Sequence, residues 1–362
     1  MKKLKLIFIT TIIATMLIAS SANSSAIGFY PTEIDKHGNV IAFDLYHGGY
    51  HSNDIKNLAH NFTAADNLVT YINQTWELPD EVDVLFLTEA DAGAEWLPTQ
   101  VTDIVNWMAL GGKLLWVAGD SDYAGLFNPT PINDILSALG AITRMDKTSI
   151  SDAVYNDGAS YRVAATQMGI GDPMYDGELI GDLSVNMVAG IICHGPCSIV
   201  GYNGTEYVDL RLGHSVFPDR LWTIMRYSEN ATADDSDVSD GPLDLYAYSA
   251  ESGNYPAVVY EYLDTVNSHI VASGEAIYSN YKYMYDQRTE NGVYNGGHQF
   301  GQILVNNILN YIMVSHEEPT PTETETELTS PTSKTVDIGI ASAIVSIAVT
   351  TIYILKRTKK KV

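Results

Sequence analysis

Basic residues are scarce in this sequence relative to acidic ones. The chain has 20 Lys and Arg against 44 Asp and Glu. Residues 27–333 hold 11 basic and 43 acidic residues, a net charge near −32. A surface of this charge repels nucleic acid and anionic lipid. We therefore expect no nucleic-acid partner, and we interpret the charge as a solvated acidic coat.

The sequence also lacks the short motifs of several common sites. It contains no Ser-His-Asp signature, no phosphate-binding glycine-rich loop, no zinc-protease motif and no internal repeat. The acidic loop at 234–241, DDSDVSDG, resembles part of a calcium loop. Its glycine falls one position late, however, and the closing glutamate is missing. We expect no bound metal and no cofactor.

The start of the chain has the three parts of a secretory signal. Three lysines lie among the first five residues, and an uncharged run then covers residues 6–19. Small residues follow, with Ser20-Ser21-Ala22 and Ser24-Ser25-Ala26 as alternative cleavage sequences. The run is shorter than the ~20 residues that a membrane span needs. We predict a signal peptide at 1–26.

The end of the chain has the pattern of a stalk, a membrane span and a basic tail. Residues 338–355 are uncharged and would extend about 27 Å as a helix. Five basic residues follow, which places the tail in the cytoplasm. The preceding Thr-, Pro- and Glu-rich residues cannot bury a core and predict an extended stalk. We predict a single-pass protein of the cell membrane with its N-terminal domain outside the cytoplasm.

Four sequons lie in the region predicted to be extracytoplasmic. The Asn-X-Thr pattern alone is weakly specific, but a translocated chain with four copies is predicted to be a glycoprotein. The candidate glycosylation sites are Asn61, Asn73, Asn203 and Asn230.

The first part of this region alternates between buried strands and amphipathic helices. Residues 39–44, 82–88 and 113–118 are apolar runs of strand length. Helices are expected between them, at 64–73 behind a Thr63/Asp66 capping box and from Pro98 to Gly111. This βαβ rhythm predicts a doubly wound, mostly parallel sheet.

The later part changes character and then returns to the first pattern. Short β-type runs separated by turn residues fill 148–262, whereas 269–273 and 297–313 predict a closing strand and helix. The predicted fold class is α/β, flavodoxin-like or amidotransferase-like, with an inserted β-rich segment and one C-terminal transmembrane helix. The predicted divisions are a signal peptide at 1–26, a first α/β part at 27–147, a β-rich segment at 148–262, a closing α/β part at 263–315, a stalk at 316–335, a transmembrane helix at 336–355 and a basic tail at 356–362.

Polar residues follow several of the predicted parallel strands. Ligands bind beyond the carboxyl ends of strands in open α/β sheets. A cluster of carboxylates and histidine there could hold a ligand, or it could cap helices and bond the loop backbone. The ligand-binding candidates are Asp44, His47, Asp120, Asp122 and Glu275.

Cys193 lies in a motif that resembles a catalytic site. The sequence Ile192-Cys193-His194-Gly195-Pro196 resembles the nucleophile elbow of the ThiJ/PfpI family. An elbow requires a helix after the turn, to lower the thiol pKa, whereas residues 197–204 are β-branched and glycine-rich. We therefore favour a non-catalytic Cys193. The pair Cys193 and Cys197 could also form a disulfide, provided that the chain turns tightly between them.

Several segments together resemble the class I glutamine-amidotransferase-like superfamily. They are IAFDLYHGGYHS, VDVLFLTEAD, IVNWMALGGKLLWVAGDSDY, IVASGEAIYSN and FGQILVNNILNYI. The superfamily keeps its nucleophile after the helix ending in Gly-Gly-Lys, a position that here falls at Ala118 or Gly119. Neither residue is a nucleophile. The resemblance therefore implies a non-catalytic branch, a pseudoenzyme.

Within that branch the chain is similar to GIFT-type domains. The run GIICHGPCSIVGYNGTEYVDL looks like a β-segment of the 48-kDa-type accessory subunit of oligosaccharyltransferase. This resemblance implies a scaffold or binding protein, with an oligosaccharyltransferase-like membrane complex or a glycan as partner and an accessory role in surface protein glycosylation. The alternatives are an extracytoplasmic receptor for a sugar or small ligand and a Cys-dependent hydrolase or amidotransferase.

Overall fold

The computed structural model describes a large part of the region between the predicted signal and stalk. The chain divides into two compact units, Met1–His316 and Glu317–Val362. The predicted signal peptide, stalk, span and tail lie outside the described residues. Among the helices that are described, none is long and apolar enough to cross a bilayer. The described residues are 38–48, 54–87, 95–123, 127–168, 190–211, 217, 220–234, 253–285 and 301–314.

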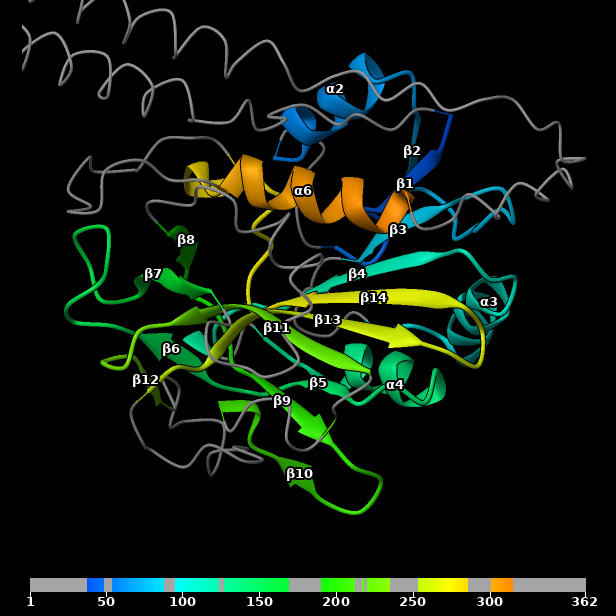
Figure 1. Cartoon of the computed structure of the whole chain (residues 1–362). Coiled ribbons are helices and arrows are strands. Elements are labelled where there is room, and N and C mark those ends of the chain that lie inside the picture. Colours follow the sequence, from blue (N-terminus) through cyan, green and yellow to red (C-terminus); the bar gives the residue numbers. More distant parts are fainter. Residues whose placement is uncertain are drawn as a thin grey trace, which may run out of the picture. The chain divides into compact units, whose positions relative to one another are not determined.

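A nine-stranded sheet forms the centre of the first unit (Figure 1). Its first five strands are parallel to their neighbours and its remaining neighbours are antiparallel. The predicted parallel sheet is therefore confirmed for one half. In order across the sheet the strands are β2 (Leu68–Ile72), β1 (Val40–Asp44), β3 (Val84–Leu87), β4 (Leu114–Ala118), β14 (Ser268–Ser273), β13 (Pro256–Leu263), β11 (Leu221–Tyr227), β7 (Arg162–Met168) and β8 (Ile191–His194).

The parallel half has the strand order of flavodoxin-like sheets. With the fifth parallel strand supplied by β14, the order is 2-1-3-4-5. In such sheets the chain reverses its direction of winding between the first and third strands. The reversal point here lies between β1 and β3.

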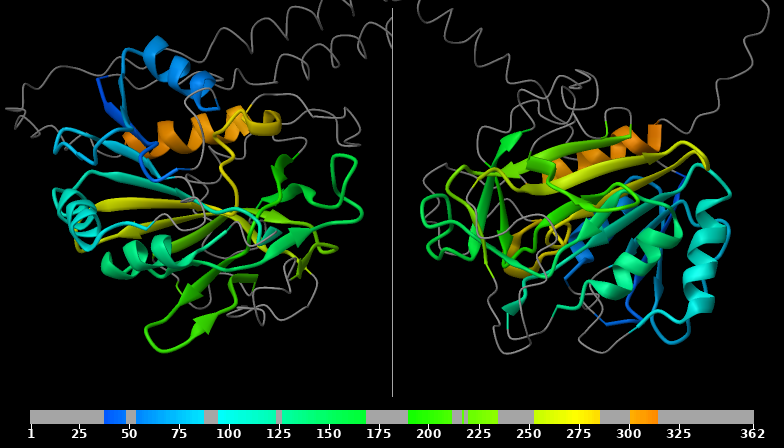
Figure 2. Two further views of the ribbon diagram at one scale, coloured as in Figure 1. Left: turned by 180° about the vertical axis from the view of Figure 1, so that it is seen from behind. Right: turned by 90° about the horizontal axis from the view of Figure 1, so that it is seen from below.

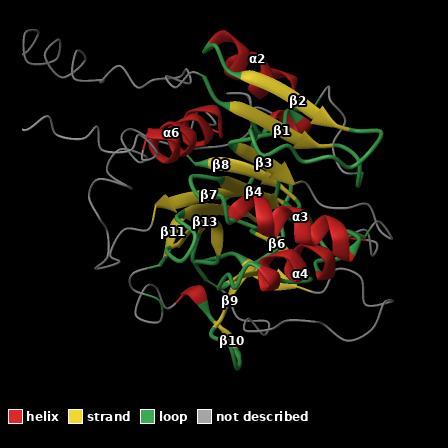
Figure 3. Ribbon diagram, turned by 90° about the vertical axis from the view of Figure 1, so that its right-hand side faces the viewer, coloured by secondary structure: helices red, strands yellow, loops and turns green. Residues whose placement is uncertain are grey.

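Helices cover both faces of the sheet. They are α2 (Lys56–Ala64), α3 (Pro98–Met108), α4 (Thr130–Ala138) and α6 (Gly301–Val314). Successive strand residues point to opposite faces, so Phe43 packs in the core under α2 and α6, whereas Ala42 belongs to the core under α3 and α4. Figure 3 shows α6 on one side of the sheet and α3 and α4 on the other. The doubly wound prediction is confirmed.

The helix predicted at 64–73 is wrong. Helix α2 ends at Ala64, and the chain turns through Asp66, whose φ is +58°, into strand β2. Thr63 forms no capping box, since its hydroxyl donates to the Ala59 carbonyl inside α2. Leu68 is 64% exposed, so the helical spacing of apolar residues did not mark a buried stripe. The β-branched residues of this segment favour a strand.

Residues of the predicted β-rich segment continue the main sheet. Strands β7, β8, β11 and β13 form its antiparallel half, and a tight turn through Asn267, with φ +50°, returns the chain from β13 to β14. Figure 2 shows this half from behind and below. Two small sheets pack beside it, one of β10 (Tyr207–Val208), β9 (Ile199–Tyr202) and β5 (Thr143–Met145), and one of β12 (Thr232–Asp234) and β6 (Ser149–Ser151).

Candidate functional site at the carboxyl edge of the sheet

One edge of the main sheet gathers the ends of strands from both halves. The carboxyl ends of β1, β3, β4 and β14 lie on it because these strands are parallel. From β14 to β8 the sheet has four successive antiparallel pairings, so β8 runs in the same direction as the parallel strands. Its last residue, His194, therefore lies at the same edge. Open α/β sheets bind ligands at this edge. We therefore call it the carboxyl edge and describe its centre first.

The centre of the carboxyl edge is filled by a short segment of the chain, residues 195–198. Gly119 and Gly274 follow β4 and β14, and the Cys197 amide donates to the Gly274 carbonyl at 2.9 Å. A Cβ atom on Gly119 would overlap Cys197 Sγ, and one on Gly274 would overlap the Cys197 carbonyl oxygen. Only glycine permits so close an approach. Gly119, one of the two positions predicted for a nucleophile, therefore has no room for a side chain.

Hydrogen bonds hold the 195–198 segment in this place. The Pro196 carbonyl accepts from the Ile150 amide at 2.8 Å, and the Ser198 amide donates to Thr148 Oγ1 at 3.0 Å. The Ser198 carbonyl accepts from the Asp146 amide at 3.0 Å. Backbone bonds of this kind satisfy groups that are expensive to bury unpaired. Residues 195–198 are thus fixed in position by hydrogen bonds to other parts of the fold.

Cys193 lies inside β8 and does not form an elbow. Its side chain is fully buried, and burial raises the pKa of the thiol to about 12, although the neighbouring Tyr227 hydroxyl acts in the opposite direction. Strand β8 leads through Gly195 and the 195–198 segment into strand β9, where an elbow requires a helix. Neighbouring His194 points to the other side of the strand and packs between Tyr161 and Tyr281.

The two cysteines do not form the disulfide that the sequence left open. Both are buried cysteines outside any disulfide. Cys193 packs in the core under α2 and α6, and Cys197 packs in the core under α3 and α4. The sheet separates the two cores, so the turn through Gly195 directs the sulfur atoms to opposite sides.

A buried polar cluster occupies the end of β1. Asp44 Oδ2 lies 2.7 Å from His47 Nδ1, and His47 Nε2 lies 3.0 Å from Gln100 Oε1. The Gln100 oxygen also accepts the Leu97 amide at 2.6 Å, which fixes the orientation of the side-chain amide. Both ring nitrogens of His47 therefore lie within hydrogen-bond distance of side-chain oxygen atoms.

Aromatic rings enclose this cluster. The Trp96 ring centroid lies 4.6 Å from that of His47, and the Trp76 and Tyr46 centroids lie at 5.1 and 4.9 Å. Asp44 and His47 are 2% and 5% exposed. The two predicted ligand-binding residues are thus brought together, as expected, but they bond to each other and to Gln100.

Two of the other predicted ligand-binding residues, Asp120 and Glu275, bond to their own loops. Asp120 Oδ1 accepts the Ser121 amide at 2.6 Å, and Glu275 Oε1 accepts the Ala276 amide at 2.9 Å. Asp122 is buried, and its amide donates to the Thr148 carbonyl. Within the described parts of the chain, no three His, Cys, Asp or Glu residues are placed to hold a metal ion. A ligand-binding role for these three acids stays a prediction.

The four sequon asparagines differ in their surroundings. Asn73 and Asn230 are exposed. Asn203 is exposed in a turn, and its Oδ1 accepts hydrogen bonds from the amide and the hydroxyl of Thr205. Asn61 is half-buried in α2, and its Nδ2 donates to the Tyr285 hydroxyl at 2.7 Å. Glycosylation of these residues stays a prediction.

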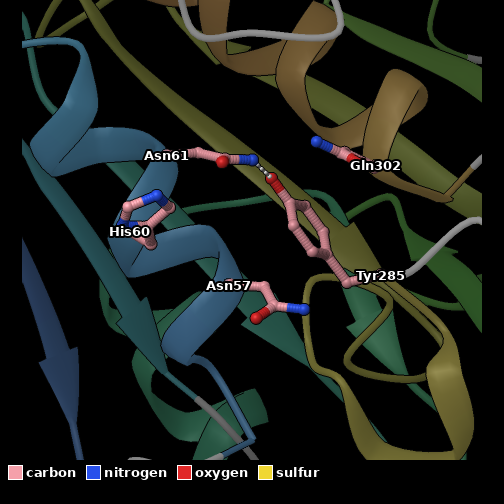
Figure 4. A pocket seen from close by; sticks show the side chains of 5 residues that line it. All are labelled: Asn57, His60, Asn61, Tyr285 and Gln302. Atoms are coloured by element: carbon pink, nitrogen blue, oxygen red, sulfur yellow. Dashed lines mark hydrogen bonds between the residues drawn. The ribbon is translucent and has the colours of Figure 1, made fainter.

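A pocket that no sequence pattern predicts lies on the face covered by α2 and α6. The pocket has a volume of about 180 Å³ and is lined by polar side chains (Figure 4). Its residues lie far apart in the chain, and Asn61 and Tyr285 are separated by 224 positions. No spacing pattern could have joined them. The lining residues are Asn57, His60, Asn61, Tyr285 and Gln302.

Comparison with known proteins gives distant structural similarity only. No family model and no curated protein matches the sequence. The N-terminal domain of mmIFT52 shares 10% identity over 76% of this chain and 97% of its own, with a TM-score of 0.48. A Thermoplasma acidophilum protein described as part of a GMP synthase shares 10% identity over 77% of this chain and 96% of its own, with a TM-score of 0.35. With TM-scores below 0.5, neither similarity assigns the chain to a family.

Proposed function

We propose that this chain is a membrane-anchored, extracytoplasmic binding or scaffold protein without catalytic activity. The observation that carries the proposal is the filled centre of the carboxyl edge. Catalysis of the amidotransferase type needs a nucleophile on the turn after β4, with open space in front of it. Here that turn is Gly119, and Cys197 Sγ occupies the space where a side chain would begin.

The properties of Cys193 support the same conclusion. A thiol attacks as its thiolate, and reactive cysteines lie in partly exposed, electropositive surroundings. Cys193 is fully buried, its pKa is raised to about 12, and the nearby charge of Glu275 also opposes ionisation. This combination argues against the hydrolase alternative.

The anchored, extracytoplasmic part of the proposal rests on the sequence. A charged start with an apolar run, a Thr- and Glu-rich stalk, an uncharged 338–355 segment and a basic tail follow the order of a single-pass protein. A membrane protein complex that modifies surface proteins with glycans is the specific partner we propose. The acidic coat would keep such a domain soluble outside the cell.

Labelling and turnover measurements on the full-length protein test the absence of catalysis. At pH 8, native Cys193 should resist iodoacetamide and react only after denaturation, because the buried thiol stays protonated. Glutaminase and esterase rates of the wild-type protein should equal those of Cys193→Ser. A rate that disappears in Cys193→Ser would contradict the proposal.

A separate experiment tests the scaffold role. Full-length protein with a C-terminal affinity tag would be isolated from its own membranes in a mild detergent. The proposal predicts stable recovery of a membrane-embedded glycosyltransferase, and no such recovery with a secreted variant that ends before residue 336. Repeated isolation without any such enzyme would count against the glycosylation role.

A further inference from the structure

The pocket between α2 and α6 has polar groups left over for a ligand. Asn57 and His60 make no side-chain hydrogen bond with the described residues, and Asn61 Oδ1 accepts none from them. Asn57 is half-buried and His60 is exposed, so both can be reached from solvent. In Figure 4 the Asn61 amide points toward the Tyr285 hydroxyl, and Asn57 lies nearer the other end of the Tyr285 side chain.

The far wall of the pocket is held rigid. Tyr285 is 1% exposed, and its hydroxyl accepts from Asn61 Nδ2 at 2.7 Å while donating to Asn306 Oδ1 at 2.8 Å. Its amide also donates to the Ser279 carbonyl at 2.8 Å. The chain of three polar groups fixes the Asn61 amide and turns its free oxygen away from Tyr285. A fixed set of donors and acceptors lowers the ordering cost of binding.

The chemical groups that line the pocket indicate which class of ligand it binds. Among the described residues that line the pocket, none carries a carboxylate, an ammonium or a guanidinium group. Asparagine and glutamine amides each offer both donors and acceptors, which matches hydroxyl groups. The volume of about 180 Å³ lies below the ~300–1,000 Å³ of pockets for drug-sized ligands. We infer that this pocket binds an uncharged, hydroxylated ligand of the size of one sugar ring.

This inference goes beyond the proposed function and does not depend on membrane anchoring or on a protein partner. Ligand binding in this pocket would compete with one predicted modification, the glycosylation of Asn61. A glycan on Asn61 Nδ2 would enter the pocket region. Thr63→Ala removes the sequon while leaving every lining residue in place, since the Thr63 hydroxyl bonds only the Ala59 carbonyl in the described structure.

The test uses the full-length chain with Thr63→Ala, solubilised in a detergent without a sugar head group. Sugars at high concentration stabilise proteins by exclusion from their surfaces, so melting temperature is a poor measure of binding. Saturation-transfer NMR would instead follow D-glucose, D-galactose and D-mannose, with D-glucuronic acid and D-glucosamine as charged counterparts. At least one neutral sugar should bind with a Kd on the order of 1 mM, and the charged sugars should bind more weakly.

Two variants place the binding in this pocket. Asn57→Ala and His60→Ala should each weaken binding about tenfold, the effect of losing one hydrogen bond. Both residues lie on the accessible side of α2, where alanine favours the helix, so the fold should be retained. Lys56→Ala, on the same helix but outside the pocket, is the matched control and should bind as before. Undetectable binding at about 50 mM of each neutral sugar, or equal binding by all three variants, would overturn the inference.

Discussion

The carboxyl edge of the main sheet is closed in two different ways. At the end of β1, closure is electrostatic, because Asp44, His47 and Gln100 satisfy one another inside an aromatic shell. At the ends of β4 and β14, closure is steric, because Cys197 lies directly on two glycines. The first region keeps polar groups of catalytic types but uses them for stability. The second region has no space for a side chain at Gly119 or Gly274.

This difference teaches that residue type alone is a weak guide to a site. Asp44 and His47 have the composition of an acid–base pair, yet their hydrogen bonds are made within the protein. Gly119 and Gly274 carry no functional group, yet their lack of a side chain allows residues 195–198 to fill the centre of the carboxyl edge. The polar pocket between α2 and α6 keeps unpaired groups, although it lies outside the edge where this class of sheet usually binds ligands.

The largest expected effect comes from breaking the electrostatic closure. Asp44→Ala removes the carboxylate and leaves the His47 ring buried without its partner. Asp44 Oδ1 also accepts the Tyr46 amide at 2.9 Å, and each buried polar group left without a partner costs about 1–3 kcal/mol. The free energy of unfolding, measured by denaturant titration, should fall by about 4 kcal/mol. Asp134→Ala removes an exposed acid on α4 and should change it by less than about 0.5 kcal/mol. Equal effects of the two variants would show that the cluster is not closed on itself.

A somewhat smaller effect should follow from disturbing the steric closure at β14. Gly274→Ala would place a Cβ atom onto the Cys197 carbonyl oxygen, which is backbone and cannot turn aside. Overpacking of this kind costs about 1–3 kcal/mol, and a backbone clash belongs at the upper end. Since the clash does not involve sulfur, adding Cys197→Ala should not restore stability. A stable Gly274→Ala protein would mean that the 195–198 segment can move away from the sheet.

The parallel half of the fold could be predicted from sequence because its signals are local. Residues 114–118 form a continuous apolar run, and Pro98 marks the start of α3. Near β2 the local signals conflicted. Leu68, Val69 and Ile72 have helical spacing, but the left-handed turn at Asp66 had already ended α2. A single residue in an unusual backbone conformation is hard to foresee from periodicity.

The candidate site was predictable only in part. The strand-end positions of Asp44 and Glu275 follow from the alternation of strands and loops, and the structure places both at the carboxyl edge. What the sequence could not show is which partners satisfy them. Gln100 reaches His47 across 53 positions, and Cys197 covers glycines at 119 and 274. These contacts join separate segments, so they depend on the completed fold.

The proposal that the protein has no catalytic activity depends most on the contact between Cys197 and the turn after β4. A double-mutant cycle measures it, through the free energies of unfolding of wild type, Gly119→Ala, Cys197→Ala and the double variant. Because the Cβ of alanine at 119 would overlap Cys197 Sγ, Gly119→Ala should destabilise the wild-type background by about 2 kcal/mol. In the Cys197→Ala background its effect should fall by at least about 1 kcal/mol. Additive effects of the two substitutions would contradict the filled nucleophile position and, with it, the absence of catalysis.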